Sequence, residues 1–240
     1  MTLRLATAGE SHGPALVAIL TGLPAGLELD RDAIDADLKR RQEGYGRSPR
    51  QQIEQDRVEV LAGLRHGKTL GTPLALVVRN VDHKNWTWGM SPWPPEGEPH
   101  GKGTKPVTLP RPGHADLPGV LKYDLDVRNA LERASARHTA VHVAAGAVAK
   151  ALLATIGVEV TGHTVDEDGL RERIDAARAE RDTVGGVVEI RAGGLPPGLG
   201  SYASKEDRLD ARLAAAVMGI QAVKGVEIGD GFALAGKFGS

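Results

Sequence analysis

The segment from residue 126 to residue 156 constrains the fold more than any other part of the chain. It is rich in alanine, contains no proline, and has Gly146 as its single glycine. Alanine is the best helix former, and a helix that is apolar around most of its circumference has to be buried. We therefore predict a long central helix that the rest of the chain covers.

Apolar runs between glycines and prolines predict the strands, and periodic apolar patterns predict the other helices. A short strand or helix start is expected within residues 14–29, and Asp30 is the predicted N-cap of a helix that ends near Gly44. The remaining strands are predicted at 58–61, 74–78, 187–192 and 223–228, and the remaining helices at 166–182 and 207–220.

Residues 80–119 have no clear periodicity and contain eight prolines and all three tryptophans. A segment of this length without periodicity in a compact chain is usually either functional or disordered. Because proline stiffens the backbone and tryptophan packs well, we predict an ordered loop that drapes over the surface and contributes to an active site.

Composition excludes several classes of function. The 30 Lys and Arg residues and the 31 Asp and Glu residues nearly cancel, so no global field attracts nucleic acid or an anionic membrane. The absence of cysteine excludes disulfides, thiolate metal sites and a cysteine nucleophile, and it fits a cytoplasmic protein. No apolar run is typical of a signal peptide or a transmembrane helix. An anion site in this chain therefore has to be local.

Two histidines lie in segments that could carry catalysis. His12 lies in the glycine-flanked segment Gly9–Gly13, where the backbone can turn sharply and leave the imidazole accessible. His114 lies in Arg111–Asp116, where a proline-stiffened loop brings a cation, an imidazole and a carboxylate together. Imidazole is the commonest proton donor near neutral pH. The alternative for each segment is a purely structural turn.

Two basic clusters are candidate anion sites, because arginine binds phosphates and carboxylates bidentately. The first spans residues 39–50, and its alternative is a solvated helix end. The second is Arg133 with Arg137, which are four apart and so share one face of the predicted central helix. Like charges there repel unless an anion lies nearby, and both a protein carboxylate and a bound phosphate remain open as that anion.

A metal site is not predicted. His138 and His142 are four apart on the predicted helix, but Thr139 stands where a zinc metalloprotease needs its glutamate. A metal-dependent hydrolase that uses these histidines remains one alternative hypothesis. A second is a non-catalytic phosphate- or nucleotide-binding module that uses the arginines without proton transfer.

In their order and spacing these clusters resemble the chorismate synthase family, and the resemblance covers essentially the whole chain. The matching motifs are Thr7–Gly13, Arg41 with Gly44–Arg47, Arg111–Asp116, Arg133–Arg137 and, the longest and most specific, Ala215–Phe232. The resemblance implies a carbon–oxygen lyase of the shikimate pathway that converts 5-enolpyruvylshikimate 3-phosphate to chorismate and phosphate. This 1,4-elimination requires reduced FMN, with NADPH as the flavin reductant in members that reduce their own flavin.

The resemblance also implies roles for individual residues. His12 would protonate reduced FMN, and His114 would protonate the departing phosphate. The implied substrate-binding residues are Ser11, Arg47, Arg50, Arg111 and Arg137; the implied FMN-binding residues are Arg133, Ala134, Ser135, Gln221 and Ala222; and Arg41 and Arg47 match positions associated with NADPH.

The fold implied by the resemblance is α+β: a layered β-α-β sandwich with helices between antiparallel sheets, formed by a single domain over residues 1–240. A cytoplasmic homotetramer without nucleic acid or membrane partners is expected. His138 and His142 stand where most members have Glu and Arg. Members also continue past the Gly-Asp-Gly-Phe segment to an Arg-Ser-Asp motif, so we expect residues 1–240 to be incomplete at the C-terminus and unable to complete a turnover.

Overall fold

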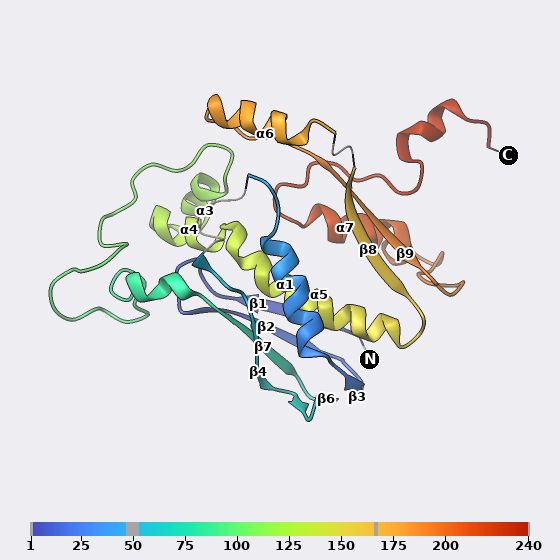
Figure 1. The fold of residues 1–240 in the computed structure, drawn as a ribbon, viewed down its shortest axis with the longest axis horizontal. Coiled ribbons are helices and arrows are strands. Elements are labelled where there is room, and N and C mark those ends of the chain that lie inside the picture. The colour runs from blue at the N-terminus through green and yellow to red at the C-terminus, as the bar shows by residue number, and fades with distance from the viewer. Residues whose placement is uncertain (1, 47–52, 166–167, 240) are drawn as a thin grey trace. The chain divides into compact units, whose positions relative to one another are not determined.

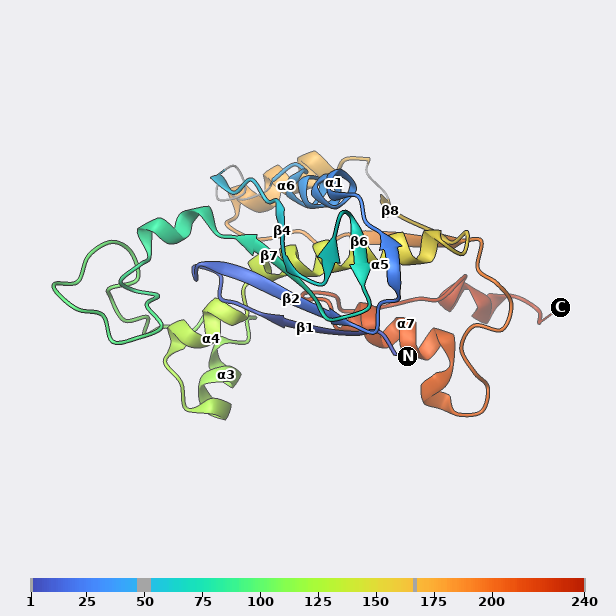
Figure 2. The same ribbon diagram turned by 90° about the horizontal axis from the view of Figure 1, so that it is seen from below.

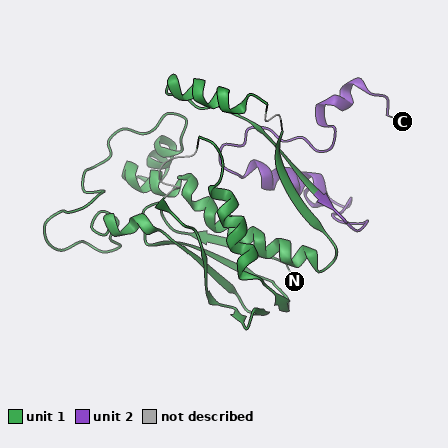
Figure 3. Ribbon diagram, viewed as in Figure 1, with its two compact units in different colours: residues 1–191 green, residues 192–240 purple. Residues whose placement is uncertain are grey.

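The computed structural model describes residues 2–46, 53–165 and 168–239. The chain divides into two compact units, residues 1–191 and residues 192–240 (Figure 3). The first unit contains the larger sheets and the central helix. Most of the residues singled out from the sequence therefore belong to the first unit.

A four-stranded antiparallel sheet forms one layer of the first unit. Its strands are, in spatial order, β1 (Arg4–Ala8), β2 (Ala15–Thr21), β7 (Leu74–Arg79) and β4 (Val58–Ala62). Strands β1 and β2 form a hairpin in which Arg4 pairs with Thr21 and Ala8 with Val17. The glycine-flanked segment that carries His12 is consequently the loop at one end of this sheet. The strands predicted at 58–61 and 74–78 are confirmed.

Helices α1 (Arg31–Gln42) and α5 (Thr139–Ala154) cover one face of this sheet (Figures 1 and 2). The side chain of Asp30 accepts a hydrogen bond from the N–H of Asp32 at 2.9 Å, so the predicted N-cap is confirmed. Small residues let α5 approach the strands closely, and its Ala140 and Ala144 are fully buried. The core lies between α5 and the alternating inward side chains Leu16, Ala18, Leu20, Leu74, Leu76 and Val78.

The long central helix predicted at 126–156 is interrupted. Helix α4 (Val127–Arg133) ends before a short 3-10 turn, η2 (Ala136–His138), and α5 follows. Ser135 is extended, with φ −68° and ψ 142°, and its hydroxyl accepts a hydrogen bond from the N–H of Arg137 at 3.3 Å. Serine competes in this way with helical hydrogen bonding. The prediction of one continuous helix is wrong at this point, and Arg133 and Arg137 do not share one helix face.

The remaining elements of the first unit are smaller. A second antiparallel sheet has the order β3-β6-β5, and β8 pairs with β9. Residues 80–119 begin with the 3-10 turn η1, run irregularly, and enter α3. The bounds are β3 (Ala25–Glu28), β5 (Leu64–Arg65), β6 (Lys68–Leu70), η1 (Val81–Asn85), α3 (Asp116–Tyr123), β8 (Glu159–Val165), α6 (Leu170–Ala179) and β9 (Val187–Gly193). Helices and antiparallel sheets in separate segments confirm the α+β class.

The second unit contains α7 (Leu209–Met218) between two 3-10 turns, η3 (Lys205–Asp207) and η4 (Gly231–Gly236). The helix predicted at 207–220 is confirmed over α7. Residues 223–228 are irregular, so the strand predicted there is wrong. A strand needs a hydrogen-bonding partner, and the described residues of this unit provide no strand beside it.

Candidate active site

His12 is held by a buried carboxylate from α4. The Nδ1 atom of His12 lies 2.8 Å from Oε1 of Glu132, and the backbone N–H of His12 donates to Oε2 at 2.8 Å. The neighbouring Ser11 N–H donates to the carbonyl oxygen of Glu132 at 3.0 Å, and His83 Nδ1 donates to the carbonyl of His12 at 2.9 Å. The Glu132 side chain has no exposed surface. The loop between β1 and β2 is thus fixed to the helix through both its backbone and its imidazole.

Trp86 covers one face of the His12 ring. The two ring centroids are 3.8 Å apart and the planes differ by 21°, which is a stacked arrangement. The indole is itself fixed, because Nε1 of Trp86 donates to Asp82 at 2.9 Å. Arg128 lies 5.4 Å from the Trp86 ring centroid, and its Nη1 is 3.6 Å from Glu132. His12 keeps 19% of its side chain exposed, so the imidazole is positioned but accessible.

Asp82 anchors the proline-rich loop at the point where it approaches His12. Its carboxylate accepts hydrogen bonds from Asn85 at 2.7 Å, from Trp86 and from Lys102 at 3.1 Å. Burial opposes ionisation of Asp82, but these three donors outweigh it and lower the pKa to about 2. Asp82 is therefore a carboxylate under all ordinary conditions, and it joins two distant parts of the loop.

The predicted segment Arg111–Asp116 forms a tight ion-paired turn. Nε and Nη2 of Arg111 donate to Asp116 at 2.9 and 3.0 Å, and the backbone N–H of Arg111 also donates at 2.9 Å. The hydrogen bond from Arg111 lowers the pKa of the Asp116 carboxyl despite its burial. The pKa of Arg111 is raised, first by that bond and further by the negative charge of Glu132.

The two histidine segments lie in one region of the first unit. Glu132 acts electrostatically on Arg111, and helices α3 and α4 pack closely, since a Cβ at Gly119 would lie 3.1 Å from the Cβ of Ala130. His114 follows in the same turn, where its N–H donates to the carbonyl of Arg111 at 3.3 Å. The turn that carries His114 therefore lies near the carboxylate that holds His12.

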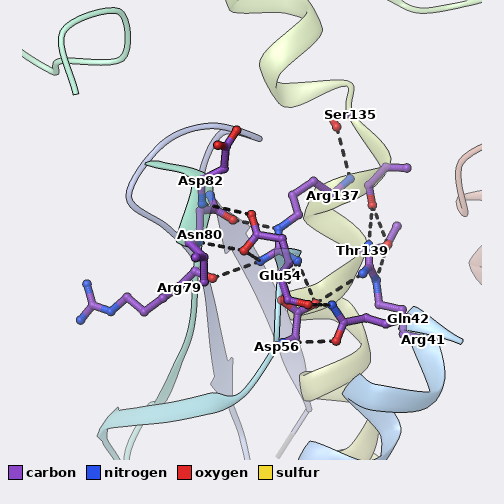
Figure 4. Close-up of polar contacts among 12 residues, drawn as sticks. Arg41, Gln42, Glu54, Asp56, Arg79, Asn80, Asp82, Ser135, Arg137 and Thr139 are labelled. Carbon is purple, nitrogen blue, oxygen red and sulfur yellow. Dashed lines mark hydrogen bonds and ion pairs between the residues drawn. The ribbon is translucent and has the colours of Figure 1, made fainter. Parts of the chain in front are cut away.

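Arg137 lies in a buried polar network (Figure 4). Its Nη1 donates to both oxygens of Asp56 at 2.7 and 2.8 Å, its Nε to Asn80 at 2.8 Å, and its Nη2 to the carbonyl of Arg79 at 3.1 Å. The guanidinium side chain is 6% exposed. Arg41 enters the same network with Nη1 at 3.4 Å from Asp56. Of the two anions that the sequence leaves open for Arg137, the structure provides a protein carboxylate.

Asn80 connects this network to the His12 loop. Its Nδ2 donates to the carbonyl oxygens of Gly13 at 2.7 Å and Glu10 at 3.1 Å. The loop also depends on Gly9, which has φ +116° and whose Cβ, if present, would lie 2.6 Å from the carbonyl oxygen of Ala15. Only glycine fits such a position. The His12 loop is thus held by Glu132 directly and by Arg137 through Asn80.

The other predicted ligand-binding residues lie in several places. Arg133 donates to the carbonyl oxygens of Thr7 and Gly9, each at 3.2 Å. Gln221 and Ala222 belong to the second unit, and Ala222 has the left-handed φ of 69°. Arg47 and Arg50 lie outside the described residues. The ligand-binding roles of all these residues stay predictions.

The structure gives no geometric support to a metal-dependent hydrolase. Within residues 2–46, 53–165 and 168–239, no group of three or more His, Cys, Asp or Glu side chains could hold a metal ion. His138 and His142 meet edge to face, with ring centroids 4.9 Å apart. Burial, together with the charges of His142, Arg133 and Arg41, lowers the pKa of His138. In the same described residues, no helix is both long enough and apolar enough to cross a membrane.

Sequence reasoning missed Glu132, Trp86, Asp56 and Asn80. Glu132 does carry a signal, because Asp126 and Glu132 are the two acidic residues of the alanine-rich segment 126–156. Asp126 stands at the first position of the segment, but Glu132 lies inside the predicted buried helix, where a carboxylate needs a partner. Asp56 and Asn80 follow no motif, and their roles become visible only when the start of β4 and the end of β7 lie beside Arg137 of η2.

The fold and the site define an α+β protein with a carboxylate-oriented histidine beside a concentration of arginines. Such a site suits proton transfer to an anionic ligand. The family model of chorismate synthase matches residues 3–167 and 164–240. The chain belongs to the chorismate synthase family.

Individual relatives agree with the family model. A chorismate synthase of Symbiobacterium thermophilum is 52% identical over 99% of the chain and 70% of the relative, and one of Rubrobacter xylanophilus is 51% identical over 97% of the chain and 66% of the relative. A crystal structure of chorismate synthase superposes with a TM-score of 0.79 at 36% identity, covering 100% of this chain and 71% of that one. The chain thus spans about two thirds of the length of these relatives.

Membership of this family indicates the type of reaction and the pathway. Chorismate synthases are lyases of the shikimate pathway and act in aromatic amino acid biosynthesis, and membership implies a flavin cofactor. The alignment with the Symbiobacterium relative runs over 273 residues, which is longer than this chain of 240. That relative therefore contains residues within the aligned range that this chain lacks, and the two segments matched by the family model meet at residues 164–167.

Proposed function

We propose that this chain converts 5-enolpyruvylshikimate 3-phosphate to chorismate and phosphate by a 1,4-elimination that requires reduced FMN. The observation that carries the proposal is His12, which is clamped by Glu132 and Trp86 while its ring stays accessible. A carboxylate that orients an accessible imidazole is the arrangement found around histidines that transfer protons. Membership of a lyase family then supplies the reaction.

Two imidazoles divide the proton transfers in this proposal. His12 holds a proton that stabilises negative charge on the reduced flavin, and His114 gives a proton to the departing phosphate. A positioned acid contributes roughly 100- to 10,000-fold to such a step. The rigid turn around His114, closed by the Arg111–Asp116 ion pair, supports the second role because it fixes the donor beside a cation.

Arginines and a serine bind the phosphate and carboxylates of the substrate. A guanidinium has five N–H donors. Two of those of Arg111 bind Asp116, so others remain available for an anion. Arg137 uses all three of its nitrogens within the protein, so its contribution is chiefly to hold Asn80 and the His12 loop. The proposed direct ligands are Ser11, Arg47, Arg50 and Arg111, and Arg137 belongs to the substrate-binding set through this supporting role.

The residues present fit an anionic cofactor. Arg133 is exposed, and its partners Thr7 and Gly9 offer neutral oxygens, so these contacts leave its positive charge available to a phosphate. We assign FMN to Arg133, Ala134, Ser135, Gln221 and Ala222, and NADPH, where the flavin is reduced in place, to Arg41 and Arg47. When bound, reduced FMN supplies an electron transiently. We also propose that the protein assembles as a homotetramer and acts in the cytoplasm.

The test combines turnover with binding. The purified chain is mixed anaerobically with reduced FMN and 5-enolpyruvylshikimate 3-phosphate, and released phosphate and chorismate are quantified. Because both imidazole segments are in place, we expect both products in equal amounts, in contrast to the expectation from the resemblance that residues 1–240 are unable to complete a turnover. Both products should be lost in His114→Ala with substrate binding retained. A non-catalytic binding module would bind the substrate in both proteins and release phosphate in neither.

A further inference from the structure

Glu132 is a fully buried carboxylate that takes no part itself in the proton transfers proposed above. It accepts two hydrogen bonds from His12, one from the backbone N–H at 2.8 Å and one from Nδ1 at 2.8 to 2.9 Å. Both carboxylate oxygens of Glu132 thus accept hydrogen bonds from His12. Burial of a carboxylate is costly unless it is paired and hydrogen-bonded, so this arrangement is a specific one.

A carboxylate can only accept hydrogen bonds, and this fixes the chemistry of the imidazole. A neutral imidazole carries one N–H, on either Nδ1 or Nε2. With Glu132 ionised, the Nδ1 atom has to donate, because two acceptors at 2.8 Å repel each other. The proton that the ring gives up and takes back is then the one on Nε2, at the opposite edge of the ring.

We propose that Glu132 is a positioning residue that keeps the Nδ1 proton of His12 in place and so makes Nε2 the nitrogen that exchanges a proton with the ligand. The inference rests on the proposed function for the identity of that ligand. The geometry of the His12–Glu132 pair stands independently of it.

Positively charged side chains lie around Glu132. Arg128, one turn earlier on α4, has Nη1 at 3.6 Å from the carboxylate, and Arg111 lies close enough to feel its charge. Two cations from separate segments therefore face the one carboxylate. Trp86 adds a second constraint, because stacking at 3.8 Å prevents the ring of His12 from turning away from Glu132.

The first test is the tautomer of His12 in the protein itself. Nitrogen-15 NMR of histidine-labelled protein distinguishes protonated from unprotonated ring nitrogens, and a His12→Gln variant assigns the signal by its loss. At about pH 9, where an ordinary imidazole is neutral, we expect Nδ1 of His12 to carry the proton. An unprotonated Nδ1 overturns the proposal.

The second test is Glu132→Gln. An amide offers one oxygen and one NH2 group. The backbone N–H of His12 needs the oxygen, so the NH2 group faces Nδ1, which has to become an acceptor. We expect the Nδ1–H form to change from the major to the minor tautomer. The control is Asp35→Asn, which alters a carboxylate that accepts from the N–H of Val58 at 2.8 Å instead. An unchanged His12 tautomer in Glu132→Gln overturns the proposal.

Turnover separates this inference from the proposed function. If wild-type protein is active, Glu132→Gln should lower kcat on the order of 100-fold with little change in KM, because proton transfer and not binding is affected. Equal kcat in both proteins contradicts the positioning role. If wild-type protein releases no phosphate, the proposed function fails, while the tautomer measurement still decides the role of Glu132.

Discussion

Replacing Arg137 with alanine should destabilise the fold rather than weaken a surface contact. The substitution removes the cation that binds both oxygens of Asp56, and it also removes the donors to Asn80 and to the carbonyl of Arg79. The Asp56 side chain has no exposed surface, so water cannot replace the lost partner without a rearrangement.

The size of the stability loss in Arg137→Ala follows from the contacts that the substitution removes. Breaking a buried ion pair by removing one partner costs about 3 to 5 kcal/mol, because the remaining charge stays buried. Arg41 remains at 3.4 Å from Asp56 and compensates part of that charge. We therefore expect a loss near the lower limit, about 3 kcal/mol, which is a large fraction of the ~5 to 15 kcal/mol that stabilises a typical domain.

Urea denaturation followed by tryptophan fluorescence and far-UV circular dichroism measures this loss. The matched control is Arg79→Ala, which removes an arginine paired with Glu59 at 3.0 Å where both side chains are largely exposed, by 57% and 44%. Exposed ion pairs contribute roughly 0 to 1 kcal/mol, so the control should stay close to wild type. Arg137→Lys should lie between the two, because lysine keeps the charge but loses the planar fork.

The competing interpretation is that Arg137 binds substrate directly. Under that interpretation Arg137→Ala remains about as stable as Arg79→Ala, while its affinity for 5-enolpyruvylshikimate 3-phosphate decreases. A loss of stability below about 1 kcal/mol together with lost affinity would therefore refute the structural role argued here.

Three further predictions concern the loops around His12. Asp82→Asn should lower the free energy of unfolding by about 2 kcal/mol at pH 7. Because the pKa of Asp82 in the folded protein is lowered to about 2, the difference in stability between wild type and variant should shrink as the pH falls from about 4 to 2. A stability difference that does not change with pH contradicts this prediction. Gly9→Ala, at φ +116°, should lower the free energy of unfolding by roughly 1 to 3 kcal/mol, whereas Gly146→Ala, at an unobstructed position inside α5, should be neutral or stabilising because alanine is the better helix former. FMN should bind more tightly with substrate present than alone, and equal affinities in a fluorescence titration exclude a shared site.

Local sequence signals predicted local structure well. Asp30 predicts the start of α1, and the aliphatic run ending at Val78 predicts β7, because both signals depend on neighbouring residues alone. The strand predicted at 223–228 failed because pairing needs an edge that the sequence cannot reveal. Helix capping is a local signal and strand pairing is not, which accounts for the wrong strand prediction at residues 223–228.

The break at Ser135 shows the same limit inside one segment. Alanine content predicts a continuous helix, yet the serine hydroxyl caps the following turn and the backbone becomes extended. The partners of the arginines were likewise beyond sequence reasoning. Asp56 lies far from Arg137 in the chain and reaches it only because the fold brings the segment before β4 beside η2.

The break in the helix also explains how one loop can be held from two sides. In a continuous helix, Glu132 and Arg137 would have fixed directions relative to each other, set by the helical repeat. The extended residue Ser135 separates them, so Glu132 can bind the imidazole and backbone of His12 while Arg137, through Asn80, holds the carbonyl oxygens of Glu10 and Gly13. A helix-restoring Ser135→Ala should therefore disturb His12 more than it disturbs the core. Loss of the stacked Trp86 contact, measured by the ring-current shift of His12, is the expected sign, with denaturation midpoints changing little. A His12 signal that stays at its wild-type position would show that the break does not control the loop.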